Sequence, residues 1–291
     1  MTVRDLLQPD VLPARLAGLG FRDADAAGFV SAVASFDDAD WDLAEQDFGR
    51  LRENVGNVAG RLNPVPGPVV DHPAGTDAPL LAALVAVAPD VVAELRRRGL
   101  DEESAWRSAS DLGQQVHIHG LVHGRFGFGA RSWTPVNFAG SLLWLGRLQY
   151  TLEHDEVLGW NLGCHIPESG ALTPELVDES LALARRVATA VWAEFPVTAF
   201  TCTSWLLDPE LVARLAPQSN IAAFASRFAP FGERRAGARD ALFFGFHREL
   251  PDGAEVDPAS LPGDTALRRA LIEQLSAPEG AAVASGWFPL E

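Results

Sequence analysis

Four side chains with reactive or ionisable groups fall within a short stretch of the chain, from Tyr150 to Cys202. His165 carries an imidazole, and histidine side chains exchange protons near neutral pH because their ordinary pKa is about 6.5. Cys202 carries a thiol, which attacks electrophiles once it is ionised. Glu168 carries a carboxylate that can act as a base, and Tyr150, the single tyrosine, carries a phenol that can act as an acid. These four residues are candidates for catalysis, and each has an ordinary packing or hydrogen-bonding role as its alternative.

The turn between Ile166 and Leu172 could bind an anion. The alternating apolar run 159–166 leads into it, and Thr173 and Pro174 open a long helical segment after it. A strand, a small-residue turn and a helix in this order place free backbone N–H groups beyond the carboxyl end of the strand, where a phosphate or carboxylate binds well. The residues predicted to line this anion site are Ile166, Glu168, Ser169, Gly170, Ala171 and Leu172.

Strand alternation sorts the residues around this turn into two faces. On the strand before the turn, Asn161, Gly163 and His165 share one face, which is polar for the middle of a sheet. In the earlier run GRLQY, Arg147 and Gln149 share a face, and an arginine there could pair with a substrate carboxylate or a phosphate. We therefore predict four substrate-binding residues, with surface ion pairs and packing as the alternatives: Arg147, Gln149, Asn161 and Trp205.

The elements that hold these residues form two predicted domains, 1–123 and 124–291. Apolar residues recur at three- and four-residue spacings through the first domain, which predicts helices. From Gly124 onwards, glycine, phenylalanine and tryptophan become more frequent and strand-like runs begin. The predicted strands cover 141–154, 156–166, 197–207 and 241–250, with 281–290 as a final edge strand; the predicted helices cover 173–195, 209–228 and a segment capped by Asp264 and Thr265 that ends near Ser276.

Composition excludes several classes of protein. The formal charge of −16 argues against nucleic acid or an anionic membrane as the main partner. The chain has no lysine, so it cannot form a pyridoxal Schiff base or use a Walker-type phosphate lysine. Two cysteines, the lack of a recognisable leader and the lack of an apolar run of about 18 residues predict a reduced, cytoplasmic protein. The histidines 117, 119 and 123 lack the HExxH pattern, so no metal site is predicted.

Four segments carry a resemblance to a known family. They are GRLQY from residue 146, HIPESGALTPE from residue 165 with the following DES, CTSWLLDP from residue 202 and QSNI from residue 218. In this order they resemble a family of bacterial acyltransferase-domain proteins, which have a helical N-acyltransferase N-terminal domain and a GNAT-like C-terminal domain. The fold that this resemblance implies is α+β, a helical N-terminal domain followed by a GNAT-like mixed β-sheet flanked by helices.

The same resemblance implies an enzyme that moves an acyl group from acetyl-CoA or a longer acyl-CoA to an amine, by direct attack within a ternary complex. GNAT enzymes lay the pantetheine arm between two splayed parallel strands and hold the pyrophosphate on the turn after the first strand. His165 would then take the proton of the amine, and Glu168 would be the alternative base, acting through water. Tyr150 would reprotonate the leaving thiolate, and Cys202 would hold the acyl group if transfer ran through a covalent intermediate.

A departure from the superfamily's pattern keeps a second hypothesis open. The usual turn has an arginine or glutamine followed by spaced glycines, whereas this turn has one glycine, Gly170, and begins with Glu168. Phosphopantetheine on an acyl carrier protein is therefore an alternative donor, because it brings the same arm without the nucleotide. A catalytically inactive GNAT-like module that binds a small ligand or a protein is the alternative to an enzyme.

Overall fold

The computed structural model describes residues 1–59, 69–251 and 253–291, and these fall into two compact units. The first unit consists of Met1–Leu145 and Arg186–Ala193, and the second consists of Gly146–Arg185 and Glu194–Glu291. The helix α9 (Pro174–Val191) therefore contributes residues to both units. The functional division at residue 124 that the sequence suggested stays a prediction.

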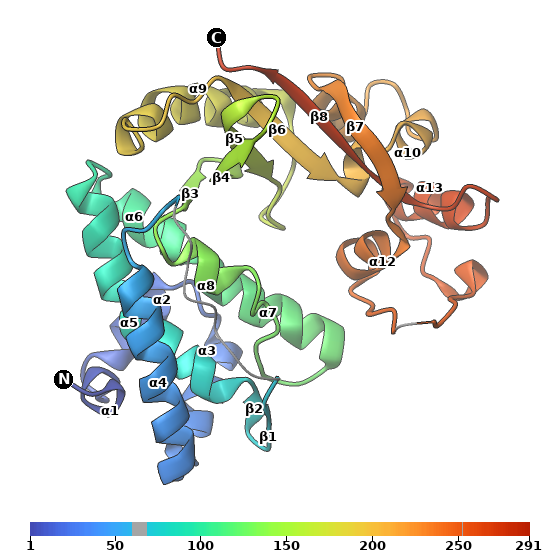
Figure 1. Cartoon of the computed structure of the whole chain (residues 1–291). Helices are drawn as coiled ribbons and strands as arrows, with labels where there is room; N and C mark the ends of the chain where they lie inside the picture. The colour runs from blue at the N-terminus through green and yellow to red at the C-terminus, as the bar shows by residue number, and fades with distance from the viewer. Residues whose placement is uncertain (60–68, 252) are drawn as a thin grey trace. The chain divides into compact units, whose positions relative to one another are not determined.

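The first unit is helical, which confirms the expectation from the spacing of its apolar residues (Figure 1). Local signals fix where its helices begin. The Asp37 side chain accepts a hydrogen bond from the Asp40 N–H while Asp40 bonds back to the Asp37 N–H, a capping box that starts α4. The elements of this unit before α9 are α1 (Val3–Leu6), α2 (Leu12–Gly18), α3 (Asp23–Ala34), α4 (Asp38–Asn54), β1 (Asp71–His72), β2 (Gly75–Thr76), α5 (Ala78–Arg97), α6 (Glu102–Ala109), α7 (Asp111–His123), α8 (Thr134–Asn137) and β3 (Leu142–Leu145).

The helix α5 is the core of the first unit. Every residue from Ala78 to Ala88 is buried, so this helix is apolar around its whole circumference for three turns. Among the described residues it is also the one helix whose length and composition would suit a membrane span, but 78% of its most apolar window is buried inside the protein. Burial of that extent is what a core helix shows.

The sheet is mixed and has six strands in the order β3-β4-β5-β6-β8-β7. The strands β4 and β5 are antiparallel, β5 and β6 are parallel, and β8 runs antiparallel to both β6 and β7. The strands after β3 are β4 (Leu148–Asp155), β5 (Gly159–His165), β6 (Ala199–Ser204), β7 (Ala229–Ala236) and β8 (Ala282–Pro289).

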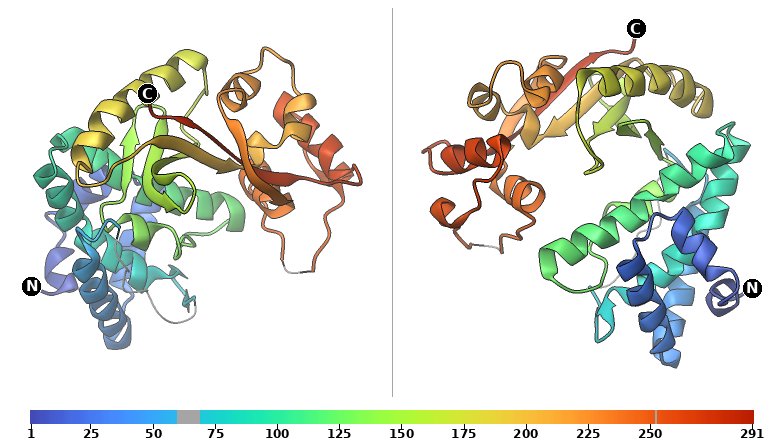
Figure 2. Two further views of the ribbon diagram at one scale, coloured as in Figure 1. Left: turned by 45° about the horizontal axis from the view of Figure 1, so that its top comes forward. Right: turned by 180° about the vertical axis from the view of Figure 1, so that it is seen from behind.

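The part of α9 that belongs to the second unit lies along one face of β4, β5 and β6 (Figures 1 and 2). Its buried residues Val177, Leu181 and Ala184 recur at three- and four-residue spacings, which gives the helix one apolar stripe for the sheet. Ser180 and Arg185 complete this contact, since Ser180 bonds to strand β4 and the Arg185 guanidinium stacks 5.3 Å from the centre of the Phe200 ring.

Shorter helices fill the rest of the second unit. The helical predictions for 209–228 and for the segment after Thr265 are confirmed, and the Thr265 side chain caps its helix by accepting from the Arg268 N–H. The bounds are η1 (Trp205–Leu207), α10 (Pro209–Ala213), α11 (Asn220–Ala225), α12 (Ala238–Phe246), η2 (Pro258–Ser260) and α13 (Ala266–Leu275).

Three of the strand predictions were wrong. The run 141–154 is not one strand, because a turn at Gly146 and Arg147 divides it into β3 and β4. The run 241–250 is not a strand, because most of it belongs to α12, where Ala241, Leu242 and Gly245 share the buried side. A short apolar run without alternation suits a buried helix as well as a strand. The tail is a strand, but β8 lies between β6 and β7 instead of at the edge, which β7 occupies.

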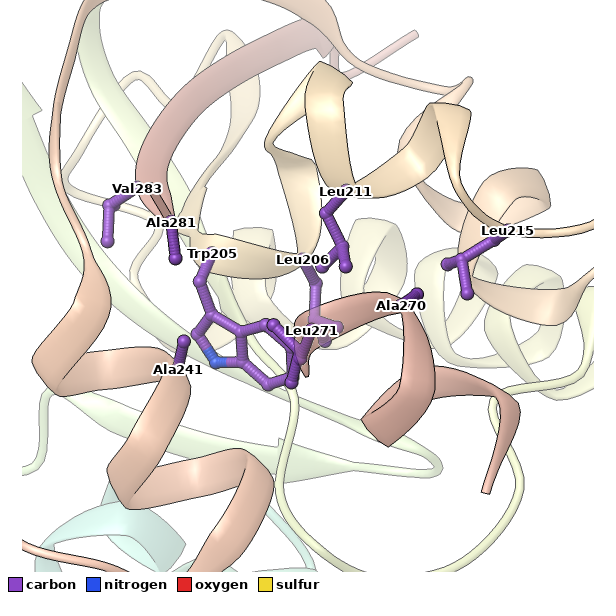
Figure 3. Close-up of a cluster of buried hydrophobic side chains, with 9 residues drawn as sticks. All are labelled: Trp205, Leu206, Leu211, Leu215, Ala241, Ala270, Leu271, Ala281 and Val283. Atoms are coloured by element: carbon purple, nitrogen blue, oxygen red, sulfur yellow. The ribbon is translucent and has the colours of Figure 1, made fainter. Parts of the chain in front are cut away.

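A cluster of buried apolar side chains beyond the end of β6 joins these short helices to β8 (Figure 3). The indole of Trp205 points into it and is only 7% exposed. This packing fixes the direction in which the chain leaves β6. The cluster consists of Trp205, Leu206, Leu211, Leu215, Ala241, Ala270, Leu271, Ala281 and Val283.

Candidate active site

The parallel strands β5 and β6 are paired only at their beginnings. The paired residues are Asn161 with Ala199, Leu162 with Phe200 and Gly163 with Thr201. Beyond them, β5 continues to His165, and β6 continues to Ser204 along its other neighbour, β8. Within the described chain, the carboxyl ends of the two central strands are therefore unpaired with each other. Strand ends that are unpaired at the middle of a sheet offer backbone groups to which an extended ligand can bond.

The turn Pro167–Leu172 follows β5, and Arg147 holds its carbonyl groups. The guanidinium donates to the carbonyl oxygens of Pro167, Gly170 and Ala171, each at 2.9 Å, and it also reaches Oγ of Ser169. The C=O and N–H groups of one trans peptide point in opposite directions. The N–H groups of the residues that follow those three carbonyls, Glu168, Ala171 and Leu172, therefore point away from Arg147.

This geometry gives the turn a surface of backbone donors. The start of α9 adds the positive end of a helix dipole next to them, because the helix begins at Pro174 after Thr173 caps it by accepting from the Leu176 N–H. Three outward N–H groups and a helix start form an environment that favours a phosphate. Gly170, with a φ of +115°, supplies the left-handed residue that the turn requires. Phosphate binding at this turn stays a prediction.

The contacts of Arg147 differ from those that the sequence predicted for it. It is only 9% exposed and its donors are directed at the turn's carbonyl groups, so it contacts the protein backbone where a substrate carboxylate or phosphate was expected. Glu168, predicted as a base or a phosphate-site residue, is half-exposed, and its Oε2 lies 2.9 Å from Nε2 of His247 at the end of α12. Glu168 thus has a histidine side chain as a partner at the turn.

His165 lies on the polar face of the sheet, beside two residues of β4. Its Nε2 is 2.8 Å from Oγ1 of Thr151 and 3.7 Å from Oε1 of Glu153, and the Thr151 hydroxyl donates to Oε1 of Glu153 at 2.6 Å. Burial by itself would raise the pKa of Glu153, but the neighbouring imidazole of His165 and the hydrogen bond from Thr151 hold it below its ordinary value. Glu153 is therefore an ionised partner for the imidazole.

The predicted substrate residues Gln149 and Asn161 line this same polar face and are buried. Asn161 donates to the carbonyl oxygen of Gly159 and accepts from the Thr201 hydroxyl at 2.7 Å, so its amide ties β5 to β6 where the two strands are still paired. Trp205, the fourth predicted substrate residue, packs into the apolar cluster beyond β6. His165 and Asn161 thus share a face, while Arg147 and Trp205 support the backbone around it.

Tyr150 and the two cysteines lie on the opposite face, towards α9. Tyr150 is fully buried, and its hydroxyl lies 2.9 Å from Oγ of Ser180; burial raises its pKa. Burial, followed by the negative charge of Glu153, raises the pKa of Cys202 to about 12, and burial raises that of Cys164 as well. The structure therefore brings together His165, Thr151 and Glu153, and places the phenol and both thiols elsewhere.

Sequence reasoning placed Gly163 on the face of His165 without giving it a role, and it missed Thr151 and Glu153. The signal was present in the alternation of TLEH, which puts Thr151 and Glu153 on one face of a strand, but their partners depend on the β4–β5 register. Gly163 faces Thr151 in that register, and a Cβ atom on it would overlap Oε1 of Glu153. Among the described residues, no group of three or more histidine, cysteine, aspartate or glutamate side chains is placed to hold a metal ion.

Comparisons with known proteins match both parts of the chain. Residues 10–140 match the N-acyltransferase N-terminal domain, and residues 142–288 match the GNAT-like C-terminal domain. No curated protein matches the chain.

Solved structures similar to this one are acyltransferases. One, in complex with decanoyl-CoA, is 28% identical with a TM-score of 0.85, over 98% of this chain and 89% of that one. A second, with decanoyl-CoA and teicoplanin, is 28% identical with a TM-score of 0.84 and the same coverage. A third, with CoA and 10C-teicoplanin, is 28% identical with a TM-score of 0.81, over 99% of this chain and 88% of that one.

Proposed function

Because the chain belongs to the acyltransferase family that joins an N-acyltransferase N-terminal domain to a GNAT-like C-terminal domain, we propose that it transfers an acyl group from acyl-CoA to the amine of a small molecule. The amine attacks the thioester directly while both substrates are bound. One observation carries this proposal: the ends of β5 and β6, which are unpaired with each other, lie beside a turn whose N–H groups Arg147 directs outwards. That pair of features suits a pantetheine arm joined to a diphosphate.

The acyl-CoA donor would bind along the turn after β5 and the ends of β5 and β6. Its diphosphate accepts hydrogen bonds from the N–H groups of Glu168, Ala171 and Leu172 near the start of α9, and its pantetheine amide groups bond to the free edges of β5 and β6. Structural neighbours hold decanoyl-CoA, so a medium-length acyl chain is the first donor to test. A carrier protein offers the arm without the nucleotide, and the diphosphate contacts therefore favour CoA.

We assign the transfer of the amine's proton to His165. The amine nitrogen attacks the carbonyl carbon of the thioester, a C–N bond forms, the C–S bond breaks and CoA leaves as a thiolate. The proton of the amine passes to the imidazole of His165 and then to the thiolate, so that amide and free thiol are the products. The protein's net charge of −16 favours an acceptor that arrives as an ammonium ion and loses a proton on binding.

One neighbour holds teicoplanin together with decanoyl-CoA, which supports a small-molecule acceptor for this chain too. The acceptor's amine would approach over the polar face of the sheet, because His165 lies on that face. Cys202 lies on the other face with a raised pKa, which supports direct transfer over an acyl-cysteine intermediate.

Calorimetry and a thiol-release assay test the proposal. Decanoyl-CoA and CoA should bind in the micromolar range, and decanoyl-CoA should release thiol only when a suitable amine is present. His165→Ala should lower kcat by about 10²- to 10⁴-fold with little change in donor binding. His154→Ala is the matched control, since His154 lies on β4 against Trp160 and away from Thr151.

Two results would contradict the proposal in different ways. If neither CoA nor decanoyl-CoA binds at millimolar concentration, CoA is not the donor. If both bind and no amine of a broad panel releases thiol, the chain is an inactive GNAT-like binding module.

A further inference from the structure

A carboxylate, a hydroxyl and an imidazole form a hydrogen-bonded chain across strands β4 and β5. The Thr151 hydroxyl lies between the other two groups, 2.6 Å from Oε1 of Glu153 and 2.8 Å from Nε2 of His165. The β4–β5 register brings these residues together by pairing Thr151 with Gly163 and Gln149 with His165, all on the polar face. The chain thus ends on the group to which we assign proton transfer.

Hydrogen positions along this chain follow from the chemistry of its members. The pKa of Glu153 is lowered, so its carboxylate is ionised and can only accept. The single hydroxyl hydrogen of Thr151 is therefore directed to Oε1 of Glu153, and the oxygen of Thr151 accepts from its other neighbour. That neighbour is Nε2 of His165, which must carry a hydrogen. In a neutral imidazole the other nitrogen, Nδ1, then holds the lone pair.

The carboxylate of Glu153 occupies the space that a side chain at Gly163 would fill. A Cβ atom at this position would overlap Oε1 of Glu153 and lie 2.7 Å from Oγ1 of Thr151, closer than side-chain packing allows. Gly163 has a φ outside the left-handed region, so backbone conformation does not require glycine here. A Cβ atom at this position would instead displace the Glu153 carboxylate, so the glycine leaves room for it. The glycine, the hydroxyl and the carboxylate are thus one arrangement built around His165.

We propose that Glu153 is a positioning residue that acts through Thr151, holding His165 with its hydrogen on Nε2 so that Nδ1 takes the proton of the acceptor amine. This inference rests on the proposed function. During attack the amine's proton goes to Nδ1, the imidazole becomes a cation beside the Glu153 carboxylate, and Nδ1 then passes the proton to the departing thiolate. Glu153 keeps its charge throughout.

Isosteric variants test this role. Glu153→Gln removes the negative charge and Thr151→Val removes the hydroxyl, while each keeps the shape of the side chain. Either should lower kcat by about 10- to 100-fold, a smaller loss than that for His165→Ala, with the KM for decanoyl-CoA changed less than about twofold. Glu156→Gln, in the exposed turn after β4, is the matched control and should leave kcat unchanged.

The tautomer gives a readout that a merely structural role would not change. Long-range ¹H–¹⁵N spectra of protein with labelled histidine should show the His165 side chain with its hydrogen on Nε2, assigned among the seven histidines by comparison with His165→Gln. In Glu153→Gln the Nδ1–H form should become populated, because the Thr151 hydroxyl no longer has an anionic acceptor.

These experiments test the positioning role of Glu153 separately from the proposed acyl transfer. An Nδ1–H tautomer in the unmodified protein, or an unchanged kcat in both Glu153→Gln and Thr151→Val, would overturn the positioning role. The tautomer is measured without substrate, so it supports or overturns the hydrogen-bonded chain even if no acyl transfer is found. Failure of the unmodified protein to bind CoA would overturn the proposed donor alone.

Discussion

The carbonyl oxygen of Gly170 lies 2.9 Å from Nη2 of Arg147, a residue in the tight turn between β3 and β4. The superfamily's turn uses several glycines to bring backbone N–H groups close to a pyrophosphate, and this turn has one. Arg147 reaches three carbonyl oxygens of the turn at once, which fixes the direction of the N–H groups opposite to them. A side chain from the turn between β3 and β4 thus supports a backbone conformation that glycines would leave flexible.

Arg147→Lys should weaken the binding of decanoyl-CoA. A lysine has one nitrogen and cannot donate to three carbonyl groups in the plane of a guanidinium, so the turn loses its fixed shape. Lost charge-assisted hydrogen bonds are worth about 1.5–3 kcal/mol each, and we expect Kd to rise at least about tenfold. Calorimetry with decanoyl-CoA measures this change.

Decanoyl-pantetheine separates this effect from general damage, because it lacks the diphosphate. Its transfer kinetics should be nearly the same in Arg147→Lys and in the unmodified protein. Arg235→Lys, on the exposed strand β7, serves as the control and should leave both donors unaffected. Equal losses for decanoyl-CoA and decanoyl-pantetheine would show that Arg147 supports the fold and does not direct the turn towards phosphate.

Both cysteines should be unreactive in the folded protein. With the pKa of Cys202 raised to about 12 by burial, almost none of this thiol is ionised at pH 8. A thiol reagent should label neither residue within minutes in buffer and both in denaturant, and intact mass after incubation with decanoyl-CoA should show no acyl adduct. An adduct on Cys202 would replace direct transfer with a covalent route.

Local patterns in the sequence were enough to predict the strand, the turn and the helix that carry the candidate site. The alternation of 159–166, the turn with Gly170 and the helix that starts after Thr173 appear in the structure as β5, the Arg147-bound turn and α9. His165 was singled out because alternation puts it on a polar face. These inferences depend on residues close together in the chain, where periodicity and turn chemistry are informative.

Other features depend on pairings that no local pattern reveals. The partners of His165 are fixed by the β4–β5 register, and the donors of Arg147 reach a turn about twenty residues further along the chain. The strand β8 lies between β6 and β7 because it pairs with both of them, whereas its sequence alone predicted an edge strand. The run after Gly237 forms α12 because its small buried residues pack on α13 and Trp205.

Tyr150→Phe should cost stability and leave catalysis nearly unchanged. The Tyr150 hydroxyl lies 2.9 Å from Oγ of Ser180 on the face towards α9, opposite to His165. Removing one buried hydrogen bond lowers the free energy of unfolding by about 1 kcal/mol. Urea denaturation measures that loss, and kcat with decanoyl-CoA should stay within about twofold. A fall in kcat of tenfold or more would instead support Tyr150 as the acid that protonates the thiolate.

His119 is a buried histidine in α7 of the first unit. It is 6% exposed, and neither of its ring nitrogens has a hydrogen-bond partner among the described residues. Burial, followed by the charges of His123 and Arg125, lowers its pKa to about 4. An unfolded histidine titrates near ~6.5, so between these two values the unfolded chain binds a proton that the native protein does not. The free energy of unfolding must therefore fall as the pH falls through this window.

His119→Leu should remove this loss of stability at acid pH. The difference between about 6.5 and about 4 corresponds to at most about 3.4 kcal/mol, most of which the unmodified protein should lose between pH 7 and pH 4 in excess of the variant. Urea denaturation of both proteins at half-unit pH intervals measures the difference. His123→Gln, an exposed neighbour on the same helix, should keep most of the pH dependence of the unmodified protein. Identical pH dependence in His119→Leu and the unmodified protein would mean that His119 is protonated or solvated in the folded state.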